Sequence, residues 1–72
     1  MTEYLRALAQ RLRAGETVAG LGNLSTGEYL WVAMAASRLD LLEKSSYAKL
    51  DEAWRRLGRE DQAELVRFWE DL

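Results

Sequence analysis

Carboxylates are the most numerous side chains of this chain that could do acid–base chemistry. The 72 residues include 12 Asp and Glu but no His and no Cys. A Ser–His or Cys–His nucleophile pair is therefore impossible, and no imidazole base is available near neutral pH. The usual zinc ligands are missing, and the carboxylates are scattered among other solvated charges. We therefore expect a protein that is not an enzyme and has no catalytic residue, metal or cofactor.

Aromatic and arginine side chains are instead the candidates for a partner-binding site, because Trp and Arg are over-represented at interaction hot spots. The spacing of Trp54 predicts a core position, whereas Trp31 suits either the core or an interface. The Arg pair beside Lys49 forms a small basic surface, a pattern that is more typical of a solvated helix face. The candidate partner-binding residues are Trp31, Leu65, Phe68, Trp69, Arg55 and Arg56.

The stretch LSTGEYLWVAMAA, residues 24–36, predicts the central helix of the fold. Ser25 and Glu28 have the spacing of a capping box, with Leu24 and Tyr29 placed to form a hydrophobic staple. The apolar residues that follow cover every face of this helix, which indicates burial all round. The run stops at Ser37, far short of the roughly 20 apolar residues that a membrane span needs. We expect no membrane segment, no signal peptide and a cytoplasmic location.

A first amphipathic helix is predicted from a cap at Thr2 to about Ala14, with Gly15 ending it. Its apolar stripe is Leu5, Leu8 and Leu12, with Tyr4 beside them. Residues 15–24 contain three glycines and are expected to be a loop. The apolar residues of this loop either cover the core or meet a partner; they are Val18, Leu21 and Leu24.

The second half of the chain predicts a short helix and two longer ones. Leu39, Leu41 and Leu42 indicate an extra helix, or an extension of the central one, that ends near Lys44. Ser45 or Ser46 is then expected to cap a helix through Leu57, followed by Gly58 as its C-terminal cap. Its expected inner face is Tyr47, Leu50, Ala53, Trp54 and Leu57. The last helix, residues 59–72, has an expected inner stripe of Ala63, Val66, Trp69 and Leu72, widened by Leu65 and Phe68.

These elements predict one all-α domain over residues 1–72, a bundle of four to five short helices around the central apolar helix. Apolar residues make up 49% of the chain, although a domain of this length buries only roughly 60% of its unfolded surface. A two-fold homodimer would cover the excess. We expect Leu65, Phe68 and Trp69 at its seam, with Trp31 there or directly beneath. The alternative is a monomer in which Val18 and Leu21 cover the same surface.

Four motifs carry a resemblance to small helical proteins encoded by phages and prophages of Gram-negative bacteria. They are the Leu-Ser-Thr-Gly-Glu helix start at residues 24–28, the Ala/Val-rich helix at 32–36, the Arg-x-Asp-Leu-Leu turn at 38–42, and the aromatic-led helix ending in Arg-Leu-Gly at 47–58. Such proteins are often host-takeover factors, such as anti-CRISPR proteins, anti-activators of transcription or inhibitors of host motors. The resemblance implies stoichiometric binding to a host bacterial protein, and it covers about half of the chain.

Two other classes of function stay open from the sequence. A helix-turn-helix DNA-binding regulator is suggested by the two last helices and their short turn. The second of these helices, however, carries Glu60, Asp61, Glu64, Glu70 and Asp71 against only two arginines, the wrong sign for phosphates and base edges. Nucleic-acid binding is therefore disfavoured, as is mimicry of DNA by those carboxylates. A phage assembly or structural helper is the remaining alternative.

Overall fold

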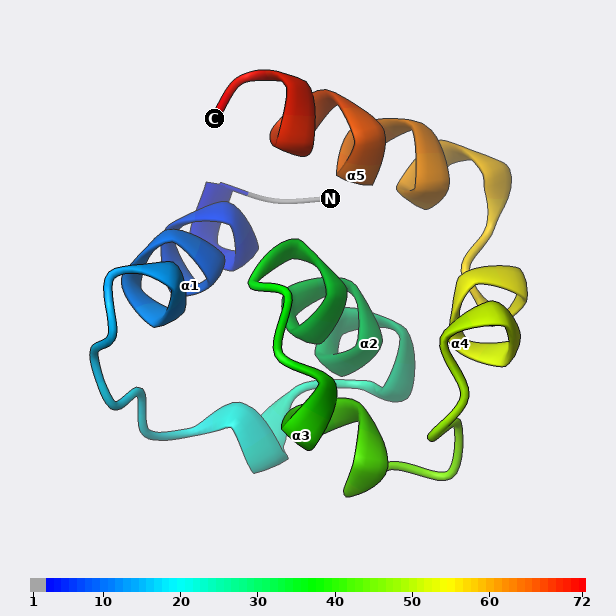
Figure 1. Ribbon diagram of the computed structural model, residues 1–72, viewed down its shortest axis with the longest axis horizontal. Coiled ribbons are helices and arrows are strands. Elements are labelled where there is room, and N and C mark those ends of the chain that lie inside the picture. Colours follow the sequence, from blue (N-terminus) through cyan, green and yellow to red (C-terminus); the bar gives the residue numbers. More distant parts are fainter. Residues whose placement is uncertain (1–2) are drawn as a thin grey trace.

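Five α-helices and one short 3₁₀ helix form the computed structural model, which describes residues 3–72 (Figure 1). No strand occurs in this range, so the all-α class predicted from the sequence is confirmed. The fold measures 27 × 26 × 18 Å along its principal axes. The elements are α1 (Glu3–Arg13), η1 (Leu21–Asn23), α2 (Thr26–Ala35), α3 (Leu39–Glu43), α4 (Leu50–Arg56) and α5 (Arg59–Glu70).

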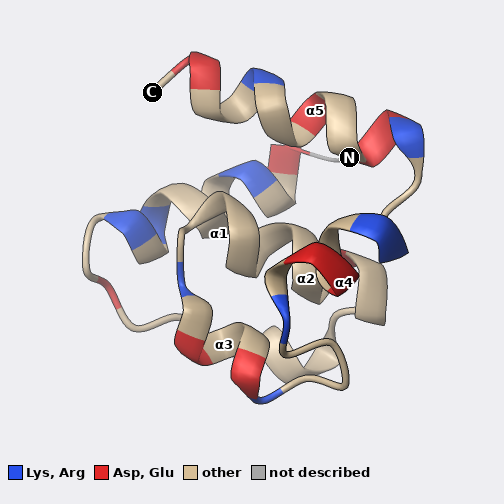
Figure 2. Cartoon of the chain, turned by 45° about the vertical axis from the view of Figure 1, so that its right-hand side comes forward, with Lys and Arg blue, Asp and Glu red and all other residues tan. Residues whose placement is uncertain are grey.

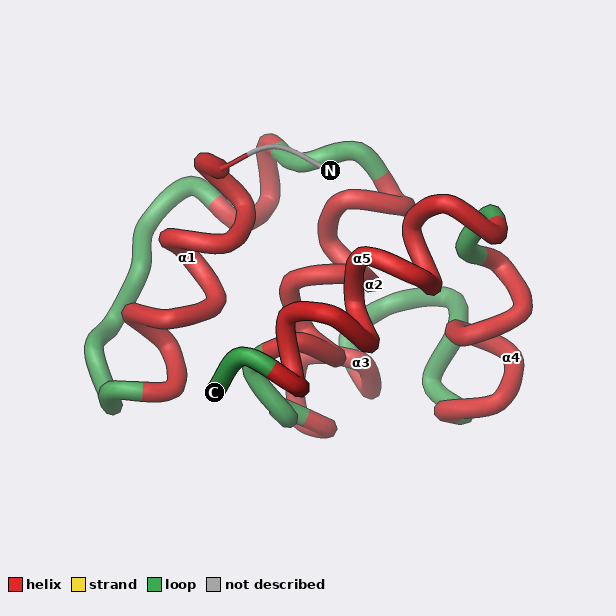
Figure 3. Tube along the Cα trace, turned by 90° about the horizontal axis from the view of Figure 1, so that it is seen from above, coloured by secondary structure: helices red, strands yellow, loops and turns green. Residues whose placement is uncertain are grey.

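Helix α2 lies at the centre, and α1, α3 and α5 pack against it (Figure 1). Every residue from Leu30 to Ala36 is buried, as the all-apolar pattern predicts. The capping box is also confirmed, because Ser25 Oγ accepts a hydrogen bond from the Glu28 backbone N–H at 3.2 Å. Glu28 Oε1 accepts from the Ser25 backbone N–H at 2.9 Å in return. Seen from above, α5 lies over α2 while α4 stands at one edge (Figure 3).

Helix α1 buries its predicted stripe of Leu5, Leu8 and Leu12, while Tyr4 stays exposed. Gly15 has a φ of 86°, and the backbone N–H groups of Gly15 and Glu16 donate back to the carbonyls of Leu12 and Arg11. This is the Schellman ending that a glycine favours. The predicted cap at Thr2 lies outside the described residues.

The loop after α1 returns along the core. Val18, Leu21 and Leu24 are partly buried and pack against the main cluster of core residues, as the core-covering alternative predicts. Helix α2 then ends at Ser37, whose φ of 57° is unusual for a residue with a side chain. The Arg38 backbone N–H donates to Ala33 O at 2.9 Å, so a second Schellman ending separates α3 from α2.

Helix α4 differs from the sequence prediction at both ends. It begins at Leu50 with Lys49 at its N-cap, so neither Ser45 nor Ser46 caps it. The Ser45 hydroxyl instead donates to Leu42 O and accepts from the Tyr47 backbone N–H. Ser45 thus closes α3 rather than starting α4. Gly58 has a φ of −74° and stands at the N-cap of α5, so it is not a left-handed C-terminal cap. Leu50, expected on the inner face, is 53% exposed.

Helix α5 buries a different face from the one predicted. Leu65 and Phe68 point into the core, whereas Val66 and Trp69 are partly exposed and Ala63 is exposed. The rotation follows from the partner on α2: the Trp31 ring meets Phe68 edge-on at a centroid distance of 5.6 Å. Trp31 Nε1 also donates to the Asp61 carbonyl at 3.1 Å. Trp31 therefore contacts α5 at two places, the Asp61 carbonyl and the Phe68 ring.

Candidate interaction surface

Three of the predicted partner-binding residues belong to the interior of the chain itself. Trp31 and Leu65 are 0% exposed and Phe68 is 1% exposed. The expectation that Leu65 and Phe68 form a dimer seam is therefore wrong for this fold. For Trp31, the core alternative holds. The reason is that these side chains already fill the space between α2 and α5 and complete each other's packing.

Trp69 is the predicted aromatic residue that reaches the surface. It is 37% exposed, and its ring stacks on Trp54 at a centroid distance of 6.4 Å and an interplanar angle of 13°. Offset stacking of two aromatic rings at this distance is a favourable contact. Trp54 itself is partly buried against the core. The pair thus joins α4 to α5 and leaves part of Trp69 open to solvent.

The two predicted arginines lie together on the last turn of α4, away from the aromatic residues of the core. Arg55 donates to Asp51 Oδ2 at 2.6 Å, one turn earlier on the same helix. Arg55 and Arg56 line a shallow surface hollow with Ser46, Tyr47 and Glu52. Helix α4 carries Asp51 and Glu52 in its first turn and Arg55 and Arg56 in its last, so both signs of charge occur on it (Figure 2). The pattern fits a solvated face with internal pairing, the simpler expectation from the sequence.

A mainly apolar hollow lies between four helices, and we call it the apolar groove. Its volume is about 250 Å³. The floor comes from buried residues of α2 and α3, and the sides come from the first residue of α3, the first residue of α4 and the end of α5. The lining is Ala33, Met34, Ser37, Arg38, Leu39, Leu42, Leu50 and Trp69. Leu39 is 60% exposed and Leu50 is 53% exposed, so large apolar side chains border the groove in open solvent.

Charge in the groove is neutralised within the chain. Arg38 is the only ionisable residue in its lining among the described residues. Its Nε and Nη2 donate to the two oxygens of Asp40 at 2.8 and 2.7 Å, the bidentate geometry that Arg and carboxylates favour. These bonds hold the pKa of Asp40 at about 2, and they raise the pKa of Arg38. Both groups therefore stay ionised at neutral pH and present a paired, locally neutral edge.

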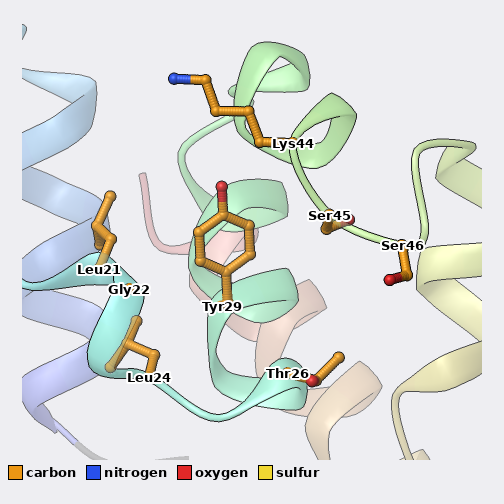
Figure 4. A pocket seen from close by; sticks show the side chains of 8 residues that line it. All are labelled: Leu21, Gly22, Leu24, Thr26, Tyr29, Lys44, Ser45 and Ser46. Carbon is orange, nitrogen blue, oxygen red and sulfur yellow. The ribbon is translucent and has the colours of Figure 1, made fainter.

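A second hollow of about 270 Å³ lies beside the loop and α3 (Figure 4). Tyr29 projects into it between the 3₁₀ helix and Lys44, with Thr26 and Ser46 at its edges. The Tyr29 hydroxyl donates to Leu41 O at 2.7 Å, and desolvation followed by the charge of Asp40 raises the pKa of this phenol. Tyr29 is therefore a neutral structural donor at physiological pH, which disfavours a role for it as a general base.

The sequence did not single out Leu39 and Leu50, the residues that border the apolar groove. Leu50 has the helical spacing of the core face, three residues before the buried Ala53, but it is the first residue of α4 and is exposed. Leu39 is one of three leucines in five residues, of which Leu41 and Leu42 are buried. The feature that could have indicated an exposed Leu39 is its place at the first position of α3.

Comparisons with family models, with curated proteins and with solved structures each find no match to this chain. Within residues 3–72, no cluster of three or more acidic side chains is placed to hold a metal ion. No helix in this range has the length and apolar character needed to cross a membrane. The apolar groove, with its partly exposed aromatic and aliphatic rim, is thus the candidate site that the geometry offers.

Proposed function

We propose that this protein is a non-enzymatic binding protein that inhibits or redirects a host bacterial protein by stoichiometric contact. The resemblance to small phage and prophage proteins supports the host-directed part of the proposal. The partner would be a transcription regulator, a CRISPR component or a motor protein. The action would take place in the cytoplasm of the host cell.

The single observation that carries the proposal is the apolar groove with Leu39, Leu50 and Trp69 around it. Large apolar side chains gathered at a hollow mark an interaction site more often than isolated ones do. A concave apolar surface beside a partly exposed Trp also suits an anchoring side chain from a partner. The floor is rigid because Ala33, Met34 and Leu42 are buried members of the core. A partner would therefore meet a preformed site.

The chemistry of the groove favours an apolar segment as the bound part of the partner. Its sides come from three separate helices, and its one ionisable lining group is already paired with Asp40. A charged segment would gain little from such a lining. A Leu, Ile, Met or Phe side chain would instead bind favourably, because its apolar surface leaves water on entering. We therefore expect the groove to bind an exposed hydrophobic patch of a host protein.

The helix-turn-helix alternative has less support. Residues 57–58 do join α4 directly to α5, which is the feature that suggests it. Helix α5 has Glu60 and Asp61 in its first turn, where a recognition helix would present donors to base edges. Acidic residues also outnumber the two arginines along α5, whose charged positions are coloured in Figure 2. A phage assembly helper would use the same groove, and only the identity of the partner separates that alternative from an inhibitor.

The test is an affinity capture of tagged protein from a Gram-negative lysate, with quantitative mass spectrometry of what remains bound. The wild type is compared with Leu50→Asp, which places a charge at the groove. Tyr4→Asp is the matched control, because Tyr4 is equally exposed but lies on α1 and does not line the groove. A host protein retained by the wild type and Tyr4→Asp but lost with Leu50→Asp supports the proposal. A partner that Leu50→Asp still retains, or specific recovery of DNA alone, contradicts it.

A further inference from the structure

We infer that helix α4 is a movable wall of the apolar groove, which opens away from α5 as a unit while α1, α2 and α5 stay packed. The inference rests on the proposed function in that it concerns access to the same groove. Leu50 of α4 and Trp69 of α5 both line the groove, and Trp54 of α4 stacks on Trp69. The hinges are the non-helical segments beside α4, residues 44–49 and 57–58. Opening therefore widens the groove and uncovers the face of Trp69 that Trp54 covers.

Helix α4 is too short to be stable by itself. It has seven residues, whereas isolated helices shorter than about 12–15 residues are marginal in water. Its N-cap is Lys49, whose side chain makes no capping hydrogen bond. The first backbone N–H groups of α4 therefore lack the side-chain acceptor that Ser25 supplies to α2. The helix depends on its contacts with the rest of the fold.

The contacts of α4 with the core are few. Within residues 43–60, the buried side chains are Ala53 and Leu57, and Trp54 is partly buried. In α2, by contrast, every residue from Leu30 to Ala35 is buried. Helix α4 also stands at one edge of the fold (Figure 3). Elements that bury little apolar surface open at a lower free energy than the whole fold, so α4 should open without global unfolding.

Two contacts with α5 hold the C-terminal half of α4 in place. Gln62 Nε2 donates to Trp54 O at 2.8 Å and to Leu57 O at 3.4 Å. Carbonyls at the end of a helix need donors from outside it, and this amide supplies one. The Trp54 ring also stacks on Trp69, with 6.4 Å between the ring centroids. Loss of either contact should shift α4 towards the open form.

Helix α5 has anchors of its own and can stay in place when α4 opens. Trp31 Nε1 donates to Asp61 O at 3.1 Å, and the Trp31 ring packs edge-on against Phe68. The Arg6 guanidinium lies over the Phe68 ring at 5.5 Å from its centroid, a cation–π contact. Leu65 is fully buried as well. These contacts join α5 to α1 and α2 and do not depend on α4.

Thiol labelling tests the inference, because the chain contains no Cys and each variant therefore carries a single thiol. Ala53→Cys places it on α4 and Ala35→Cys places it on α2; both alanines are 0% exposed. When opening is fast relative to labelling, the labelling rate follows the population of the open form. Ala53→Cys should react at least about tenfold faster than Ala35→Cys. Its rate should also depend less steeply on urea, since a local opening exposes less surface than global unfolding.

Two further substitutions separate local opening from global unfolding. Gln62→Ala removes a contact that is broken in the open form, so it should speed labelling of Ala53→Cys about fivefold, the equivalent of one hydrogen bond. Ser25→Ala is the matched substitution, because it removes a cap of similar strength from α2, which stays folded in the open form. It should speed labelling of Ala35→Cys about fivefold and leave the rate of Ala53→Cys unchanged.

Equal labelling rates with equal urea dependence for the two thiols would overturn the inference. Equal acceleration of both thiols by Ser25→Ala would do so too, because α4 would then open only when α2 unfolds. Native-state hydrogen exchange of the unmodified chain decides the same question if a thiol variant folds poorly. The backbone amides of Ala53 and Trp54 should be less protected than those of Met34 and Ala35, and equal protection would contradict the movable wall.

All of these measurements use the free protein. Their results are therefore independent of the capture experiment with host lysate, and failure of the movable wall and failure of the proposed function remain distinguishable.

Discussion

Ser25 and Glu28 show how far single residues of this chain specify local structure. Both hydrogen bonds of the capping box were expected from residue type and spacing alone, and both form. Such bonds depend on neighbours within four residues, so no knowledge of the tertiary fold is needed to predict them. Ser45 shows the opposite case, because two short-range roles competed for one hydroxyl and the end of α3 used it.

Replacing Ser25 by Ala should lower the free energy of unfolding by about 1 kcal/mol, the usual cost of losing an N-cap side chain. Ser46→Ala is the matched control, because Ser46 is exposed and lies between two helices; it should change stability by less than about 0.5 kcal/mol. Urea unfolding followed by circular dichroism measures both. Equal stability of the wild type and Ser25→Ala would contradict the role of this cap.

Tyr29 makes the stability of the protein depend on pH in the alkaline range. Its pKa in the folded chain is raised above the usual value by desolvation and then by Asp40, and its hydroxyl donates to Leu41 O. The neutral phenol therefore stabilises the fold below pH about 10, the pKa of an unfolded Tyr. This contribution is lost as pH rises through the higher folded pKa.

Tyr29→Phe should accordingly be less stable than the wild type at pH 7–9 by about 1 kcal/mol, the net value of one such hydrogen bond. The difference should shrink above pH about 10, since Phe has no proton to lose. Chemical unfolding at a series of pH values measures it. A stability difference that grows with alkaline pH would show that the sign of the shift is wrong.

At the scale of elements, the ends of the helices explain both the success and the limits of the sequence analysis. Gly15 was predicted to end α1 because its conformational freedom is a local property, and it does so. Ser37 ends α2 in the same left-handed conformation, but residue type gives no such signal for a serine. Its hydroxyl accepts from Arg13, 24 residues earlier, a long-range contact that no local pattern contains.

Arg13 joins α1 to the end of α2, and its loss should therefore weaken the packing of the two helices. One guanidinium nitrogen donates to Ala35 O at 2.9 Å and to Ser37 Oγ at 3.2 Å. There the carbonyl needs a donor and the helix dipole favours a cation. Arg13→Ala should cost about 1 kcal/mol, measured by thermal or urea unfolding.

Arg11→Ala is the control for that substitution, because Arg11 lies on the same helix and pairs with Glu16 on the surface. An exposed pair of this kind contributes roughly 0–1 kcal/mol. Arg13→Ala should therefore be the more damaging change. If the two variants were equally stable, the contact between Arg13 and the end of α2 would have no energetic weight.

At the scale of the whole molecule, the fold class and the central helix were predicted correctly from the sequence, but the exposed face of α5 was not. The all-apolar pattern of residues 29–36 requires burial whatever surrounds it. The buried face of α5 could not be predicted in the same way, because its apolar residues cover more than one face of the helix. These residues are Leu65, Val66, Phe68 and Trp69. In the fold, Leu65 and Phe68 are the buried pair, and Phe68 packs edge-on against Trp31. Trp69 is thereby left partly exposed at the groove.

Phe68 and Trp69 are neighbours on α5 with opposite environments, and their substitution should separate core from surface. Phe68→Ala should lower the free energy of unfolding by about 3–5 kcal/mol, the usual cost of deleting a buried aromatic side chain. Trp69→Ala should cost clearly less, because its ring is partly exposed and stacks on one side only. Urea unfolding compares the two. A larger loss for Trp69→Ala would mean that α5 is rotated as the sequence first suggested.

The central claim is that a host protein meets this chain at the apolar groove, and site-specific photo-cross-linking in bacterial cells tests it most directly. A photoreactive phenylalanine is introduced separately in place of Leu39, Leu50, Tyr4 or Arg56. We expect one cross-linked host protein, identical for the Leu39 and Leu50 positions and absent from Tyr4 and Arg56. Cross-links that form only from Tyr4 or Arg56, with none from Leu39 and Leu50, would contradict it.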